Sequence, residues 1–199
     1  LKDSREFLHT LRIDLFPEEV YVFTPKGDVK ALPRGATPID FAFSIHTDIG
    51  LRCAGARVNG RIVPLRYELQ NGDIVEILTG ATQHPSRDWL KIVKTSRARS
   101  RIKAWIKNEE RVRSITLGKE LLDREFRKLG KATSSLSKAE ALAQVFDHYK
   151  VGSEEELYAA IGFGKIAPRQ VVLKLLPPEQ AQAFVEEESR GRKTPVKAA

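Results

Sequence analysis

The fold is decided by residues 20–80, VYVFTPKGDVKALPRGATPIDFAFSIHTDIGLRCAGARVNGRIVPLRYELQNGDIVEILTG. At its start, VYVFT (20–24) is β-branched and aromatic, turn residues occupy 25–28, and VKAL (29–32) returns the chain. Two β-prone runs on either side of a Pro- and Gly-containing turn are typical of a β-hairpin. We therefore expect the first two strands of a sheet here.

A helix start follows the hairpin, in TPIDFAFSIH (37–46). Thr37 can supply an N-cap oxygen, and Pro38 presets φ at the first helical position. Asp40 stands three residues after the cap, where its carboxylate can accept a hydrogen bond from the cap's own N–H. A short helix is therefore predicted from Pro38, with Gly50 as its expected end.

Two Asn-Gly pairs mark further turns. Asn59-Gly60 joins two strand-like runs in CAGARVNGRIVPL (53–65), which is the pattern of a type I′ hairpin. The second pair, at 71–72, precedes the apolar run IVEIL (74–78). The order strand, strand, helix and then further strands predicts a β-grasp, ubiquitin-like sheet.

Residues 86–188 have the pattern of helices. Capping boxes or prolines predict four helix starts: after Ser137, after Ser153, and at Pro168 and Pro177. The segment GFGKIA (162–167) matches the G-x-G-x-x-A pattern of dinucleotide-binding loops. Because it follows the helical pattern ELYAAI rather than a strand, we interpret it as a turn that ends a helix.

These patterns predict an α+β fold in four parts. They are a linker or helical lead-in at 1–17, a β-grasp domain at 18–80, an all-helical domain at 81–188 and a disordered linker at 189–199. The sequence contains no Met, and its first residues, LKDSREFLHTL, are unlike a secretory leader. We therefore expect an excised segment of a longer cytoplasmic protein.

The residues of common catalytic and metal sites are sparse. The single cysteine, Cys53, excludes an internal disulfide and a Cys-x-x-Cys zinc site, and its strand pattern predicts a buried, inert thiol. The four histidines lack metal-binding spacing, and the Gly-Lys pairs lack the other residues of a phosphate-binding P-loop. No uncharged apolar run approaches the roughly 20 residues that cross a bilayer. We expect no catalytic residue, metal, cofactor or membrane contact in this segment.

The net charge of +8 comes from one short region. Residues 1–86 contain 10 basic and 11 acidic residues, residues 87–131 contain 15 and 6, and residues 132–199 contain 9 and 9. Within that region, residues 91–107 hold seven Lys or Arg and no Asp or Glu. Such a concentration of basic residues indicates a polyanionic partner more strongly than a high pI alone.

A helical wheel separates this basic segment into an apolar and a basic side. The apolar arc, about 120° wide, holds Ala98, Ile102, Trp105, Ile106 and Val112. The candidate RNA phosphate contacts on the other side are Arg97, Arg99, Arg101, Lys103 and Lys107. A solvated surface is the alternative, but the segment lacks the acidic i,i+4 partners of an ordinary soluble helix, so we favour polyanion contact. Trp89 and Trp105 are expected in the core rather than as base-stacking platforms.

Residues 20–80 resemble the TGS domain, which is shared by threonyl-tRNA synthetases, certain GTPases and the RelA/SpoT stringent-response enzymes. The continuation PSRDWLKIVKTSRARSRIKAWIK (85–107) resembles the RelA/SpoT family specifically, and ELYAAIGFGKI (156–166) is similar to the later part of that family's helical domain. The similarity covers about residues 15–185. In that family the (p)ppGpp synthetase and hydrolase domains precede this region. The resemblance therefore implies a regulatory segment without catalysis of its own.

The resemblance also implies a partner. In many members the TGS domain contacts the 3′ CCA end of deacylated tRNA in the ribosomal A site, where ribosomal RNA is also within reach. His46 matches the TGS histidine implicated in that contact, while Leu51 stands where relatives often carry a second histidine. By pattern alone, His46 shares a wheel arc with Ile39 and Phe43 and would be a core or C-capping histidine. With the resemblance, we favour an exposed stacking face.

Two functions are thus expected from the sequence. The first is a tRNA- and ribosome-sensing region that controls the upstream (p)ppGpp synthetase or hydrolase domains of the same chain. The alternative is a protein-interaction module, because some members of the family use TGS to bind acyl carrier protein or another protein regulator. Acyl carrier protein is acidic and could use the same basic residues.

Overall fold

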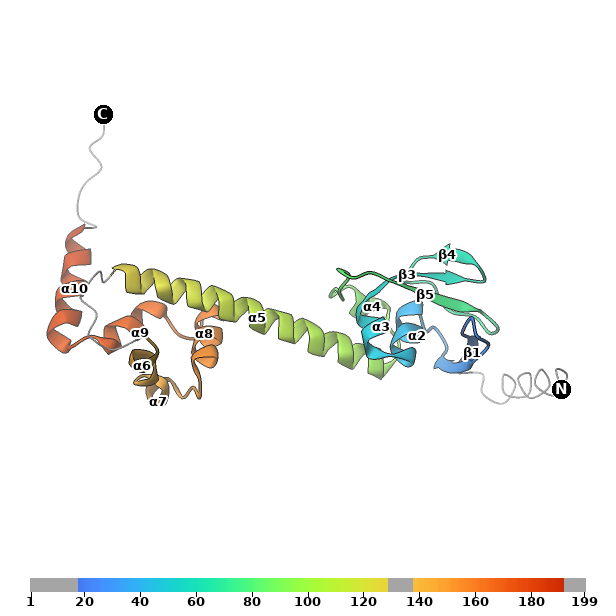
Figure 1. Cartoon of the computed structure of the whole chain (residues 1–199), viewed down its shortest axis with the longest axis horizontal. Helices are drawn as coiled ribbons and strands as arrows, with labels where there is room; N and C mark the ends of the chain where they lie inside the picture. The colour runs from blue at the N-terminus through green and yellow to red at the C-terminus, as the bar shows by residue number, and fades with distance from the viewer. Residues whose placement is uncertain (1–17, 129–137, 192–199) are drawn as a thin grey trace, which may run out of the picture. The chain divides into compact units, whose positions relative to one another are not determined.

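A computed structural model describes residues 18–128 and 138–191 of the chain (Figure 1). The chain divides into two compact units, with the boundary between Asn108 and Glu109. The expectations for 1–17 and 192–199 lie outside the described residues. None of the helices in the described ranges is long and apolar enough to cross a membrane.

The first unit has the predicted β-grasp arrangement. Its strands are β1 (Glu19–Phe23), β2 (Val29–Pro33), β3 (Cys53–Val58), β4 (Arg61–Val63) and β5 (Val75–Thr79), and its helices are α2 (Pro38–Ile45), α3 (Thr47–Leu51), α4 (Trp89–Ile92) and the start of α5 (Ser96–Lys128). β1 pairs antiparallel with β2, and β3 pairs antiparallel with both β4 and β5. A parallel bridge between Phe23 and Ile74 joins the hairpin to the residue that precedes β5. The α+β prediction is therefore confirmed.

The predicted turns have the backbone conformations that their residues suggest. Asn59 and Gly60 have φ values of 52° and 79°, which is the pair of positive angles that a type I′ turn between β3 and β4 requires. Gly72, before β5, has a φ of 86°. Glycine adopts these angles without the steric cost that a Cβ would bring.

Helix α2 begins as predicted but ends earlier. Thr37 is its N-cap, Pro38 is its first residue, and the Asp40 carboxylate accepts a hydrogen bond from the Thr37 N–H at 2.9 Å. The expected end at Gly50 was wrong, because His46 adopts an extended φ of −157° and a second short helix, α3, starts at the next residue. Gly50 lies inside α3, where a Cβ would overlap the ring of Phe43. The glycine permits close packing of α3 on α2 rather than ending a helix.

Two clusters of buried side chains form the core of the first unit. One lies among the strands and includes Val22, Phe41 and Val75. The other joins one face of α2 to α4 and the first turns of α5, and its members include Phe43, Trp89, Cys53, Ala98 and Ile102. Because this second cluster includes residues of α5, the start of the long helix is part of the β-grasp unit's core.

The second unit is helical throughout its described residues. It contains the later part of α5 with α6 (Lys138–Ala143), α7 (Phe146–Tyr149), α8 (Glu154–Gly162), α9 (Pro168–Leu175) and α10 (Pro178–Gly191). The predicted starts of α8 and α9 are confirmed, and α10 begins at Pro178, one residue after the predicted Pro177. Helix α6 begins next to Ser137, which itself lies outside the described residues. Gly164 has a φ of 74° between α8 and α9, so GFGKIA is a helix-ending turn. Helix α10 extends through 189–191, the first residues of the expected linker.

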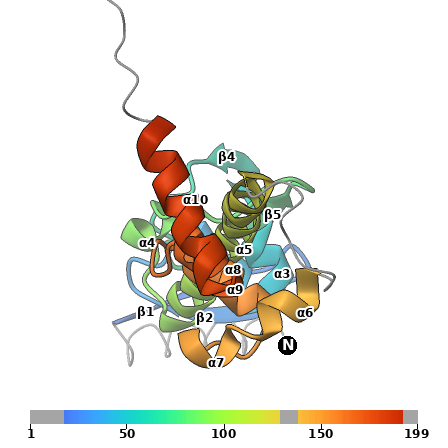
Figure 2. The same ribbon diagram turned by 90° about the vertical axis from the view of Figure 1, so that its left-hand side faces the viewer.

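Glycine allows α5 and α8 to approach closely within the second unit, where α8 lies beside the later part of α5 in two perpendicular views (Figures 1 and 2). A Cβ on Gly118 of α5 would overlap the carbonyl of Tyr158, and a Cβ on Gly162 of α8 would overlap the carbonyl of Ser114. The surrounding core includes Leu122, Leu142, Leu157, Ile161 and Val171. The two helices therefore pack backbone to backbone at this point.

Candidate nucleic-acid interface

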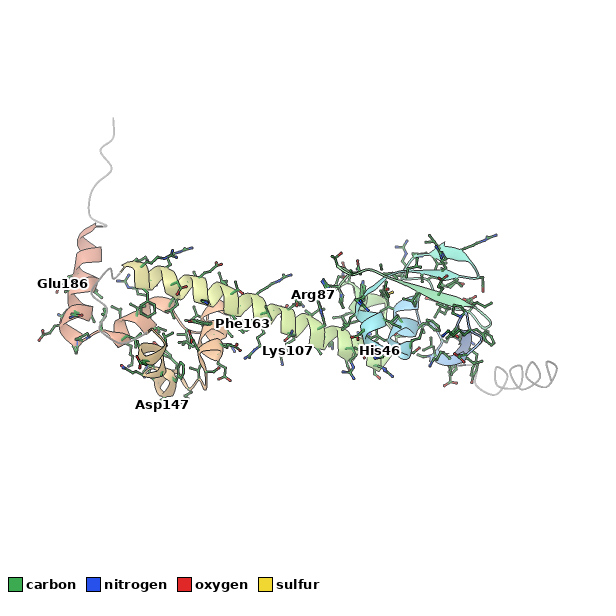
Figure 3. The ribbon with its side chains drawn as sticks, in the orientation of Figure 1. His46, Arg87, Lys107, Asp147, Phe163 and Glu186 are labelled. Carbon is green, nitrogen blue, oxygen red and sulfur yellow. The ribbon has the colours of Figure 1, made fainter. Side chains whose placement is uncertain are left out.

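His46 lies at the junction between α2 and α3 (Figure 3). Its side chain is 65% exposed, so it is not a core residue. Its Nδ1 accepts a hydrogen bond of 3.2 Å from the N–H of Asp48 and lies 3.6 Å from the Asp48 carboxylate. His46 therefore occupies two caps: its backbone N–H donates to the Ala42 carbonyl at the end of α2, as the capping prediction expected, and its side chain caps the start of α3.

The cap determines what His46 can offer to a ligand. While Nδ1 accepts this hydrogen bond it carries no proton, so the N–H donor of the ring is then Nε2. The cap orients the imidazole while most of the side chain stays in solvent. The neighbouring Ile45 is 38% exposed, whereas Leu51 packs against the core cluster that contains Phe43. An aromatic face and one N–H donor are therefore presented at the α2–α3 junction.

A buried carboxylate ties this junction to the start of α5. Asp40 is 1% exposed, and besides the cap of α2 it accepts hydrogen bonds from the N–H groups of Lys94 and Thr95 at 2.8–3.1 Å. The Thr95 hydroxyl donates to the same carboxylate at 2.7 Å and accepts from the N–H of Ala98 at 3.2 Å. Asp40 therefore holds the residue that caps α5. The capping box was readable from sequence, but these contacts across more than 50 residues were not.

The basic residues of α5 form two rows. Arg97 and Arg101 are four residues apart and lie one turn after the other along the helix, in line with Trp105. Arg99, Lys103 and Lys107 form a second row with the same spacing. The buried row of Ala98, Ile102 and the half-buried Ile106 runs between them on the core side. We call Arg97 and Arg101 the Arg97 row, and Arg99, Lys103 and Lys107 the Lys103 row.

The members of the two rows differ in what they contact. Arg99 is half-buried, and its guanidinium donates to the carbonyls of Leu90 and Val93, each at 3.0 Å, which fixes the end of α4 against α5. The other four predicted phosphate contacts are exposed: Arg97, Arg101, Lys103 and Lys107. None of these four side chains forms an ion pair with a residue in the described ranges. Among the described residues, no acidic side chain therefore lies within ion-pair distance of these four charges.

Several other side chains named in the sequence analysis pair with, or pack against, neighbouring residues. Lys91 pairs with Asp88 at 2.8 Å, and this hydrogen bond lowers the pKa of the Asp88 carboxyl. Cys53 is buried, which raises the pKa of its thiol to about 11. Trp89 is 6% exposed, as expected, but Trp105 is only half-buried and stacks on His84. Within residues 18–128 and 138–191, no group of His, Cys, Asp or Glu has the arrangement of a metal site.

Comparison with known proteins gives matches over both units. The TGS domain matches residues 20–79, and the RelA/SpoT AH domain matches residues 105–176. A GTP pyrophosphokinase of Myxococcus xanthus is 51% identical over 183 residues, which are 92% of this chain and 24% of the relative. A guanosine-3′,5′-bis(diphosphate) 3′-pyrophosphohydrolase of Aquifex aeolicus is 46% identical over 95% of this chain and 26% of the relative.

A third similar protein is the bifunctional (p)ppGpp synthase/hydrolase RelA of Mycobacterium tuberculosis, which is 43% identical over 98% of this chain and 27% of its own length. The chain thus spans about a quarter of the length of these relatives. The names of these relatives cover both (p)ppGpp synthesis and (p)ppGpp hydrolysis. The similarity therefore covers a segment that proteins named for opposite reactions share.

Proposed function

Because this chain belongs to the RelA/SpoT family and carries a TGS and an AH domain, we propose that it senses deacylated tRNA on the ribosome and controls (p)ppGpp synthetase or hydrolase domains of the same protein. The observation that carries the proposal is His46, an aromatic side chain that is 65% exposed and oriented by its hydrogen bond to Asp48. The segment itself would be regulatory rather than catalytic.

The chemistry of His46 suits the unpaired end of an RNA strand. The imidazole offers a π-face on which a terminal adenine can stack, and base stacking on aromatic side chains contributes about 1–3 kcal/mol per base. The Nε2–H can donate a hydrogen bond to a base or sugar acceptor. An amino acid esterified to the 3′ end would occupy space beside this contact, which gives a physical basis for discrimination between charged and uncharged tRNA.

The exposed basic residues of α5 supply the sequence-independent part of the proposed binding. Arg97, Arg101, Lys103 and Lys107 can contact phosphates of tRNA or ribosomal RNA and release counterions. They lie on a regular helix, and phosphate contacts position an RNA without reading its sequence. Arg99 would contribute less, because its guanidinium already donates to two carbonyls.

The proposed control is a coupling between ligand binding and the conformation of the longer protein. His46 follows α2 directly, and Asp40 of α2 binds the backbone at the start of α5. A ligand at the α2–α3 junction would therefore act on the helix whose Asp40 holds the start of α5, and α5 continues into the AH domain. Catalytic domains elsewhere in the protein would respond to which arrangement the ligand favours.

A second candidate function is binding of acyl carrier protein or another acidic protein regulator. Four exposed basic side chains without acidic partners in the described residues would attract an acidic protein as well as RNA. Titration with deacylated tRNA and with acyl carrier protein, each at two salt concentrations, separates the two candidates.

The test of the sensing proposal compares wild type with His46→Ala on deacylated, aminoacylated and CCA-trimmed tRNA. We expect the wild type to prefer deacylated tRNA and the variant to lose about 1–3 kcal/mol of binding to it, with stability changed by less than about 0.5 kcal/mol. Binding to CCA-trimmed tRNA should be equal for both proteins. A variant that is equally weakened on intact and trimmed tRNA would contradict the role of His46. His46→Phe should recover part of the loss, because it restores a π-face.

A further inference from the structure

An aromatic pair lies on the first unit in line with the Arg97 row. His84, in the loop before α4, stacks on Trp105 of α5 with ring centroids 5.2 Å apart and an interplanar angle of 16°. His84 is exposed and Trp105 is half-buried, whereas Trp89 is buried in the core. The outer side of this stack is therefore accessible to a ligand.

The pair lies next to two exposed arginines of α5. Arg101 and Arg97 precede Trp105 by one and two helical turns, about 6 and 12 Å along the axis. Both are exposed, and neither forms an ion pair within the described part of the chain. A planar aromatic surface is thus continued by two guanidinium groups along one side of the helix.

We propose that His84 and Trp105 form a stacking site for an unpaired RNA base, with Arg101 and Arg97 binding the adjacent phosphates. Single-strand binding proteins combine the same two elements, aromatic platforms for bases and basic side chains for the backbone. The site tolerates any base, because every base has a π-face. The inference rests on the proposed RNA-binding function and adds a second contact point, separate from the 3′-end contact at His46.

RNA suits this surface better than an acidic protein does. Carboxylates of a protein partner would pair with Arg97 and Arg101 but would gain little from an exposed imidazole stacked on an indole. A nucleotide uses both parts at once, since its base and its phosphate are covalently joined. The stacked histidine therefore favours RNA as the occupant.

The test uses an eight-nucleotide oligo(A) labelled with fluorescein and an abasic oligomer of the same length and charge, with binding measured by fluorescence anisotropy on the whole chain. His84→Leu fills a similar volume without a π-face, and His84→Phe restores one. We expect His84→Leu to weaken oligo(A) binding about tenfold while leaving the abasic oligomer unchanged, and His84→Phe to bind like wild type. Arg101→Ala should weaken both oligomers and flatten the slope of log K against log salt by about 0.7.

His148→Leu is the matched control, because His148 makes an edge-on contact with Tyr149 in the second unit, at a centroid distance of 4.8 Å. It should leave both affinities unchanged. Equal wild-type affinity for the two oligomers, or an unchanged affinity for oligo(A) in His84→Leu, would overturn the inference. Binding of acyl carrier protein in place of both oligomers would overturn it in favour of a protein partner. Failure of the sensing proposal is distinguishable, because that proposal depends on the CCA end and on His46, neither of which this test involves.

Discussion

Replacement of Asp40 by Asn tests how the β-grasp unit holds the start of the long helix. Both carboxylate oxygens of Asp40 accept hydrogen bonds from backbone N–H groups: Oδ2 from Thr37 and Lys94, and Oδ1 from Lys94 and Thr95. Asparagine has nearly the same shape, but one oxygen becomes an NH2 donor. Either orientation of the amide therefore places a donor against backbone donors in a site that is 1% exposed.

The expected loss follows from these contacts. A hydrogen bond to a charged group contributes about 1.5–3 kcal/mol, and a buried donor left without an acceptor adds a penalty of about 1–3 kcal/mol. Because the side chain keeps one good acceptor, we expect Asp40→Asn to lower the free energy of unfolding of the first unit by about 3–5 kcal/mol. Urea denaturation followed by tryptophan fluorescence measures this unit specifically, since Trp89 and Trp105 both belong to it.

Asp28→Asn is the matched control, because Asp28 is an exposed carboxylate in the β1–β2 turn of the same unit. Its effect should stay within about 0.5 kcal/mol. Hydrogen exchange gives a second measurement: the N–H groups of Lys94 and Thr95 should exchange faster in Asp40→Asn. A loss below about 1 kcal/mol, or unchanged exchange at both amides, would refute the assignment of Asp40 as the anchor of α5.

Three further predictions concern packing, reactivity and activity. Gly118→Ala and Gly162→Ala should each destabilise the second unit by about 3 kcal/mol in denaturant unfolding followed by circular dichroism, whereas Gly152→Ala, whose Cβ would meet only the Glu156 carboxylate at 3.6 Å, should not. Cys53 should resist a thiol reagent at pH 8 until the chain is unfolded, since burial raises its pKa to about 11. The pKa of the thiol is higher in the folded chain than its ordinary value of 9.0, so the buried neutral thiol contributes fully to stability below pH 9.0. This contribution is lost as the pH rises through about 11. Cys53→Ala should remove that part of the pH dependence of stability. The segment should neither make nor hydrolyse (p)ppGpp above a buffer control; activity that survives repurification would contradict a purely regulatory role.

The sequence by itself determined the features that depend on neighbouring residues. Thr37, Pro38 and Asp40 predict the start of α2 because a capping box needs only a three-residue spacing. Asn59-Gly60 predicts the β3–β4 turn because few residues adopt two successive positive φ angles. The α+β fold and the basic character of α5 could be read in the same way, from period and charge along the chain.

Tertiary structure decided the features that depend on distant residues. Asp40 meets Lys94 and Thr95 more than 50 residues away, so its role in anchoring α5 has no local signal. The exposure of His46 depends on where α3 packs, since the apolar arc of α2 alone favoured burial.

The basic segment and the glycines show the same difference between what the sequence predicts and what the tertiary structure decides. A helical wheel predicts two rows of side chains, but only the fold turns the Arg99 guanidinium onto the carbonyls at the end of α4. It also brings His84 onto Trp105 and the backbone of α8 onto Gly118. These contacts join segments whose approach depends on the packing of the whole unit, and sequence spacing carries no information about that approach.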